Sequence, residues 1–187
     1  MKAVKREWLL RSLASYRPFD EHESRMLEIL RRFVVEHADC FERSLSLGHI
    51  TGSAWIVDLQ REQVLLTHHH RLDKWLQLGG HADGDPDILR VALREAREES
   101  GVEALRSVSK AIFDVDVHEI PARGAEPAHY HYDVRFLLEA DRNLPLCITS
   151  ESKALAWVRL SEVDRLTKER SVLRMVAKTP RVQDFGK

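Results

Sequence analysis

The stretch that decides the fold runs from Gly79 to Val102 and reads GGHADGDPDILRVALREAREESGV. Residues 87–100 have helical periodicity, and Asp85 and Pro86 are residue types typical of the N-cap and first positions of a helix. Gly101 stands where a C-cap glycine belongs. The sequence therefore predicts a glycine-containing turn that leads into one amphipathic helix.

Three acidic residues of this helix, Glu95, Glu98 and Glu99, are related by i, i+3 and i+4. They share about a third of the helix circumference, and they border an apolar stripe that faces the core. Like charges repel at this spacing, and the last turn of a helix disfavours anions. Helix stability alone does not explain the arrangement, so we expect the carboxylates to line a cleft and to share a cation.

Clustered carboxylates are hard oxygen ligands, which favour Mg²⁺ or Mn²⁺. Such an ion neutralises the charge that develops when a phosphate P–O bond breaks. Water is then the expected nucleophile, with a carboxylate as general base. The Gly79-Gly80 pair allows close backbone approach, and a carbonyl there is a further candidate ligand.

At these residues the chain resembles the Nudix hydrolase family, whose box is Gly, five residues, Glu, seven residues, then Arg-Glu-aliphatic-X-Glu-Glu-X-Gly-aliphatic. Gly80 opens the box, and the later positions fall in register at Arg94, Glu95, Ala96, Glu98, Glu99, Gly101 and Val102. The resemblance implies an α/β/α sandwich and hydrolysis of a nucleoside diphosphate linked to a group X. It also implies that Glu98 and Glu99 hold metal, that Glu95 assists, that Arg94 braces a glutamate and that the Gly79 carbonyl is a ligand.

One position departs from this box, because Pro86 occupies the place of its first glutamate, between Asp85 and Asp87. Two alternatives to a hydrolase therefore stay open. One is a ligand-binding or regulatory module with weak or no turnover, since a fold does not fix a function. The other is a metal-dependent isomerase that uses the same site.

Further candidates lie outside the helix. In the resembling family a loop carboxylate often serves as base, which indicates Glu151. His81 is a candidate metal ligand, and clustered histidines make Zn²⁺ the alternative ion, although ordinary hydrogen-bonded histidines are the simpler interpretation. The candidate substrate contacts are Arg71, Lys74, His129, His131 and Arg135.

The rest of the chain predicts an α/β (α+β) fold: a mixed sheet with helices packed on it, behind an N-terminal helical extension. The predicted helices are 6–17, 21–37, 87–100, one that is capped at Ser161 and one that ends near 177. The predicted strands are 51–57, 63–67, 111–118, 130–138 and 154–159. We divide the chain into an extension over 1–47, a Nudix domain over 48–178 and a loose tail over 179–187.

The amino-acid composition limits the classes of partner that we expect for this chain. Lys and Arg total 29 against 30 Asp and Glu, for a net charge of −1, so neither a nucleic-acid polymer nor a membrane surface is an expected partner. The two cysteines are far apart, and the chain lacks a run of about 20 apolar residues. We expect a cytoplasmic protein that binds a small nucleotide-like substrate, with a homodimer as an option.

Overall fold

The protein is described by a computed structural model that covers residues 2–124, 127–150 and 152–179. Its helices are α1 (Lys2–Ser15), α2 (Glu21–Glu36), α3 (Ile88–Ser100), the short 3₁₀ helix η1 (Leu160–Glu162), α4 (Val163–Leu166) and α5 (Arg170–Lys178). Its strands are β1 (Gly48–Asp58), β2 (Gln63–His69), β3 (Lys74–Leu76), β4 (Leu78–His81), β5 (Arg106–Ser107), β6 (Asp114–Ile120), β7 (His129–Ala140) and β8 (Ser152–Arg159). The strands form one mixed sheet.

Strand β1 is the centre of the sheet. It pairs in parallel with β7 along its whole length, from Gly48 opposite Tyr130 to Asp58 opposite Ala140. Its other edge is shared by two antiparallel partners, β4 beside residues 51–54 and β2 beside residues 56–57. Strand β7 likewise carries β6 and β5 on its outer edge, and β8 pairs with β2. This arrangement brings β4, β1, β7 and β6 side by side at one end of the sheet.

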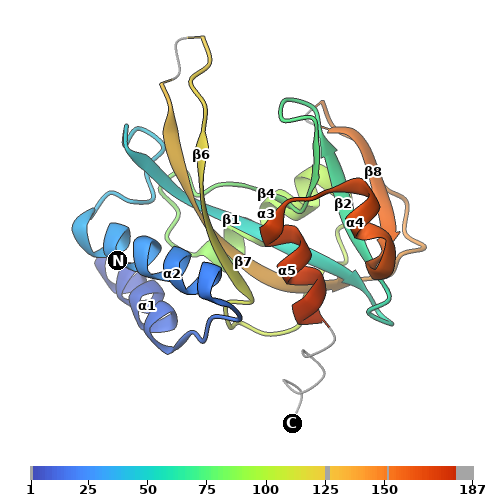
Figure 1. Ribbon diagram of the computed structural model, residues 1–187, viewed down its shortest axis with the longest axis horizontal. Coiled ribbons are helices and arrows are strands. Elements are labelled where there is room, and N and C mark those ends of the chain that lie inside the picture. The colour runs from blue at the N-terminus through green and yellow to red at the C-terminus, as the bar shows by residue number, and fades with distance from the viewer. Residues whose placement is uncertain (1, 125–126, 151, 180–187) are drawn as a thin grey trace.

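The two faces of β1 enter different hydrophobic clusters because successive side chains of a strand point to opposite sides. Ala54 and Ile56 pack with Val91 and Ala92 of α3. Trp55 and Val57 pack on the other face with apolar residues of α5, including Met175. In Figure 1, α3 lies behind the sheet and α5 lies in front of it. The expected sandwich of helices on both faces of a mixed sheet is confirmed.

Helix α3 begins two residues later than its capping pattern predicts. Asp87, not Asp85, is the N-cap, and its side chain accepts a hydrogen bond from the backbone N–H of Arg90. Asp85 instead pairs with the Arg90 guanidinium at 2.7 Å. At the other end Gly101 is confirmed as the C-cap, with φ of 72°, a left-handed conformation that glycine adopts without strain.

The N-terminal helices pack against the same core as the sheet. Leu9 and Leu13 of α1 and Leu30 of α2 are fully buried in the cluster that contains α3. The ring of Phe33 stacks on Tyr132 of β7, with centroids 3.6 Å apart and planes 3° from parallel. Figure 1 shows both helices together beside the β6–β7 end of the sheet. Helices α1 and α2 are therefore closely packed on the sheet and α3.

Two expectations for the C-terminal region were wrong in detail. Ser161 lies within η1 and caps no helix with its side chain. Thr179, predicted to begin a loose tail, is buried and accepts a hydrogen bond from Trp55 Nε1 at 2.9 Å. The remaining tail residues, 180–187, lie outside the described residues. Within the described ranges, none of the helices has the length and apolar character to cross a membrane.

Candidate active site

Two carboxylates of α3 meet the glycine pair of β4. Glu99 is buried, with 6% of its surface exposed, and its Oε2 accepts a hydrogen bond from the Gly79 backbone N–H at 3.1 Å. Glu95, one turn earlier, lies against Gly80 so closely that a Cβ at that position would be 2.4 Å from Glu95 Oε2. Only a glycine leaves room for this carboxylate. The structure thus brings together Gly79, Gly80, Glu95 and Glu99, which the sequence singled out.

Arg94 holds this arrangement in place. Its Nη2 donates to Glu95 Oε1 at 2.5 Å and to the His81 carbonyl at 2.9 Å, so one guanidinium ties α3 to the end of β4. The hydrogen bond to Glu95 also raises the pKa of Arg94, which therefore stays charged. The bracing role that the sequence predicts for Arg94 matches these contacts.

The third glutamate, Glu98, is solvent-exposed on the same helix. Near the start of α3, Pro86 is buried, and the acids on either side of it are used locally: Asp87 caps the helix and Asp85 pairs with Arg90. Both aspartates are therefore engaged in contacts at the start of α3. The carboxylate cluster of the described structure thus consists of Glu95 and Glu99, with Glu98 beside them at the surface.

A cleft of about 710 Å³ opens beside this cluster. Glu95, Gly79, Gly80 and His81 line it, as does Arg71, a predicted phosphate contact. Two further arginines that the sequence did not single out, Arg43 and Arg123, also line it. Exposed arginines around an acidic cluster provide positive charge for the phosphate oxygens of a substrate.

Two of the predicted substrate residues are engaged elsewhere. Arg135 is 2% exposed and pairs with Asp114, Asp116 and Asp133, so its guanidinium is committed to the interior and not to a phosphate. Lys74 pairs with Glu169 at 2.7 Å. The predicted base Glu151 lies outside the described residues; its neighbour Ser150 lines the cleft.

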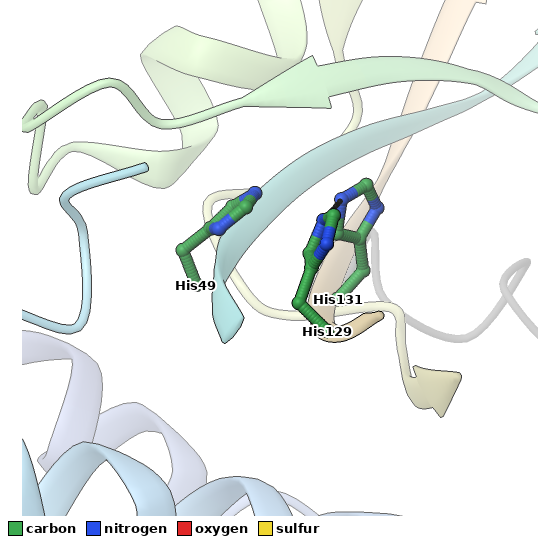
Figure 2. Close-up of side chains that lie close together, drawn as sticks. All are labelled: His49, His129 and His131. Atoms are coloured by element: carbon green, nitrogen blue, oxygen red, sulfur yellow. Dashed lines mark hydrogen bonds between the residues drawn. The ribbon is translucent and has the colours of Figure 1, made fainter. Parts of the chain in front are cut away.

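The predicted histidines His81, His129 and His131 line the cleft. His118, which the sequence did not single out, lines it too. His49 of β1 joins them: its ring centroid is 4.9 Å from those of His81 and His131. Figure 2 shows that His49, His129 and His131 point toward one another from two adjacent strands. Their candidate ligand nitrogens all lie within 4.8 Å of one another.

Comparison with known families agrees with the resemblance to the Nudix box. A family model described as the NUDIX domain matches residues 49–178. The chain belongs to the Nudix family. Comparison with curated protein sequences finds no significant match.

Solved structures resemble this Nudix protein in fold. A C. elegans Ap4A hydrolase has a TM-score of 0.59 at 16% identity, over 73% of this chain and 98% of that one. The E. coli dihydroneopterin triphosphate pyrophosphohydrolase has a TM-score of 0.54 at 17% identity, over 69% and 92% of the two chains. The NUDIX domain of Shewanella oneidensis NrtR, solved with ADP ribose, has a TM-score of 0.52 at 16% identity, over 72% and 87%.

His49 is one of the residues near this Nudix site that sequence reasoning missed. It precedes the alternating run at the start of β1, and no motif marks it. The parallel pairing of β1 with β7 places it opposite His131, and that long-range register cannot be read from local sequence. Arg43 and Arg123 were missed for a similar reason, since each lies in a loop that only the fold brings to the cleft.

Proposed function

We propose that this Nudix protein is a metal-dependent hydrolase that cleaves a phosphoanhydride bond in a nucleoside diphosphate linked to a group X. One observation carries the proposal: Glu95 and Glu99 of α3 meet at Gly79-Gly80, beside an arginine-lined cleft. Membership of the family and the names of the similar structures, which include two hydrolases of nucleotide-like phosphates, support it.

The residues present fit a hard divalent ion. Glu95, Glu98 and Glu99 offer carboxylate oxygens from one side of α3, and the Gly79 carbonyl is a further oxygen ligand in the proposal. The space beside Gly80, which a Cβ would fill, is the cradle for Glu95. Oxygen ligands of this kind select Mg²⁺ or Mn²⁺, and the bound ion would neutralise charge on the phosphate under attack.

The chain itself performs the remaining tasks in the proposal. Arg94 fixes Glu95 by its two-pronged contact with the carboxylate and the His81 carbonyl. Arg71 binds substrate phosphate at the cleft, where its exposed side chain is accessible. Glu151 stays the proposed general base, which removes a proton from the attacking water. The proposed partner is a small nucleotide-like molecule that fits a cleft of about 710 Å³.

A ligand-binding module is the second candidate, because Pro86 removes one box glutamate and both flanking aspartates are used in local contacts. The module predicts binding of the same class of ligand without turnover. The NUDIX domain of NrtR with bound ADP ribose is an example of a similar fold that binds such a ligand.

The experiment is a screen of the purified full chain against nucleotide sugars, dinucleoside polyphosphates, ADP-ribose and nucleoside triphosphates, with Mg²⁺ or Mn²⁺. We expect metal-dependent release of a nucleoside monophosphate or pyrophosphate. Glu98→Gln is expected to lower kcat/KM by roughly 10²-fold or more, because the loss of one ligand charge weakens the metal and the charge stabilisation it provides.

The matched control is Glu103→Gln, an exposed glutamate just beyond the helix, which should leave kcat/KM unchanged. Ligand binding without any product under these conditions, unaffected by Glu98→Gln, would establish the binding module in place of the hydrolase.

A further inference from the structure

The sheet places imidazoles in a row across three adjacent strands. His49 of β1 pairs with His131 of β7, and His131 pairs with His118 of β6. His129 lies two residues before His131 on the same strand, so its side chain points to the same face. His81, at the end of β4, adds a ring 5.0 Å from that of His131. The register therefore gathers histidines that are far apart in the sequence.

The distances within this cluster suit a metal ion. His129 Nε2 lies 3.3 Å from His131 Nε2. Two nitrogens bound to one tetrahedral Zn²⁺ at about 2.0–2.1 Å are separated by roughly 3.3–3.4 Å. His49 presents its ligand nitrogen within 4.8 Å of both. The three side chains thus surround one small volume (Figure 2).

His129 also shows the orienting contact that is typical of metal-ligating histidines. Its Nδ1 lies 3.0 Å from the Pro127 carbonyl oxygen, which can only accept, so Nδ1 carries the proton and donates. The Nε2 lone pair is then directed to His131. A backbone carbonyl on the other ring nitrogen is the usual means by which proteins fix the tautomer of a metal ligand.

His49 supplies an independent observation. It is 2% exposed, and neither of its ring nitrogens has a hydrogen-bond partner. Leaving a buried polar group unsatisfied costs about 1–3 kcal/mol, so such a group calls for an explanation. Burial and the neighbouring His81 lower the pKa of His49 to about 4. Burial also lowers the pKa of His131, to about 2. Both rings are therefore neutral near pH 7, the form that binds metals.

We propose that His49, His129 and His131 form a second metal site, for a divalent transition ion of the Zn²⁺ class. Three imidazoles leave one coordination position for water, a phosphate oxygen or the nearby His81. Imidazole suits Zn²⁺, whereas Mg²⁺ prefers the carboxylates of α3, so the two sites differ in selectivity. They share β4, where Gly79 and Gly80 contact the glutamates and His81 joins the histidines.

The test uses the metal-free full chain, titrated with Zn²⁺ in competition with a chromophoric chelator and with Co²⁺ as an absorption probe. We expect one tight Zn²⁺ site per chain. His49→Gln and His129→Gln should each weaken Zn²⁺ binding by more than about 10-fold. Loss of a residue that only orients a metal ligand already costs about that much, and these two residues are ligands in the proposal. The control is His37→Gln, because His37 follows α2 and takes no part in the cluster.

Two further measurements separate this site from the carboxylates and from misfolding. The double variant Glu95→Gln/Glu99→Gln should retain Zn²⁺ affinity even if it no longer binds Mn²⁺ or hydrolyses substrate. X-ray absorption of the Zn²⁺-loaded wild-type chain should show three or more imidazole ligands. Zn²⁺ affinity unchanged in both histidine variants, affinity lost in the glutamate variant, or an oxygen-only ligand set on the wild type would each overturn the proposal.

Discussion

Gly80 is the residue on which the geometry of the carboxylates depends. The Glu95 carboxylate occupies the volume that any other residue at position 80 would need for its Cβ. A β-strand normally gains from a side chain, and glycine within a strand often marks a close approach of this kind. The glycine therefore serves the site at some cost to the strand.

Gly80→Ala is expected to displace Glu95 by about an ångström and to lower kcat/KM by roughly 10²-fold, the loss that such misplacement produces. Mn²⁺ affinity should fall in parallel, while the melting temperature changes little because Glu95 can swing toward solvent. Glu103→Gln, the exposed control used above, should leave both kcat/KM and Mn²⁺ affinity unchanged. Full activity in Gly80→Ala would show that the position of Glu95 is unimportant.

At the residue scale the sequence predicts what a local motif encodes and little else. Glu95, Glu99 and Arg94 were predicted because they lie within one continuous box, and Gly79 because it directly precedes that box. Arg135 was assigned to the cleft from the alternation of side chains along its strand. Alternation shows which face of the sheet a side chain lies on, but not which other element packs over that face. In the structure α5 covers that part of the face, and Arg174 of α5 pairs with Asp114, a partner of Arg135.

At the scale of elements, long periodic segments were predicted and short ones were not. The helices α1, α2 and α3 and the pair β6–β7 overlap the ranges that periodicity predicts, although α1 covers residues 2–15 where 6–17 was predicted and β6 covers 114–120 where 111–118 was predicted. Strand β4 was missed, because Leu78-Gly79-Gly80-His81 has neither alternation nor β-forming residues. The hydrogen bonds of β4 to β1 stabilise the extended conformation, which the sequence of β4 by itself does not favour. The division of the chain at residues 47 and 178 and the option of a homodimer stay predictions.

Helix α2 is anchored to β6 and α5 through one buried carboxylate. Glu23 is fully buried and accepts hydrogen bonds from Tyr16 Oη at 2.5 Å and Lys178 Nζ at 2.7 Å. Glu23 therefore links the N-terminal extension to α5. No sequence motif marks this residue. Breaking a buried ion pair by removing one partner leaves the other charge without compensation.

Glu23→Gln is expected to lower the free energy of unfolding by about 3 kcal/mol, measured by urea denaturation. Glu21→Gln, in the exposed first turn of the same helix, should change it by less than about 0.5 kcal/mol. If both variants had equal stability, α2 would not be anchored through this carboxylate.

At the scale of the whole molecule, a buried network of charges connects α2, β6, β7 and α5. Burial alone would raise the pKa of Asp114, but hydrogen bonds from Arg174 and the charges of Arg135 and Lys178 outweigh it and hold the pKa below its usual value. The pKa of Asp116 is lowered in the same way, against burial, chiefly by Arg135. Interior electrostatics therefore favour the charged form of both acids.

These shifts predict acid sensitivity. Because the folded pKa values lie below the unfolded value of about 3.9, the stabilisation is fully present above pH 4 or so and is lost as the pH falls toward the folded values. Urea midpoints measured between about pH 5 and 2.5 should fall steeply below about pH 4. The fall should be shallower in Asp116→Asn, and equal slopes in the two proteins would contradict the assignment.

The most direct measurement of the central claim is anomalous X-ray scattering from crystals of the protein grown with Mn²⁺. The account predicts a manganese peak bounded by the carboxylates of Glu95 and Glu99 and the carbonyl of Gly79, which is lost in Gly80→Ala. An empty position there at saturating Mn²⁺, with both carboxylates turned to solvent, would contradict it.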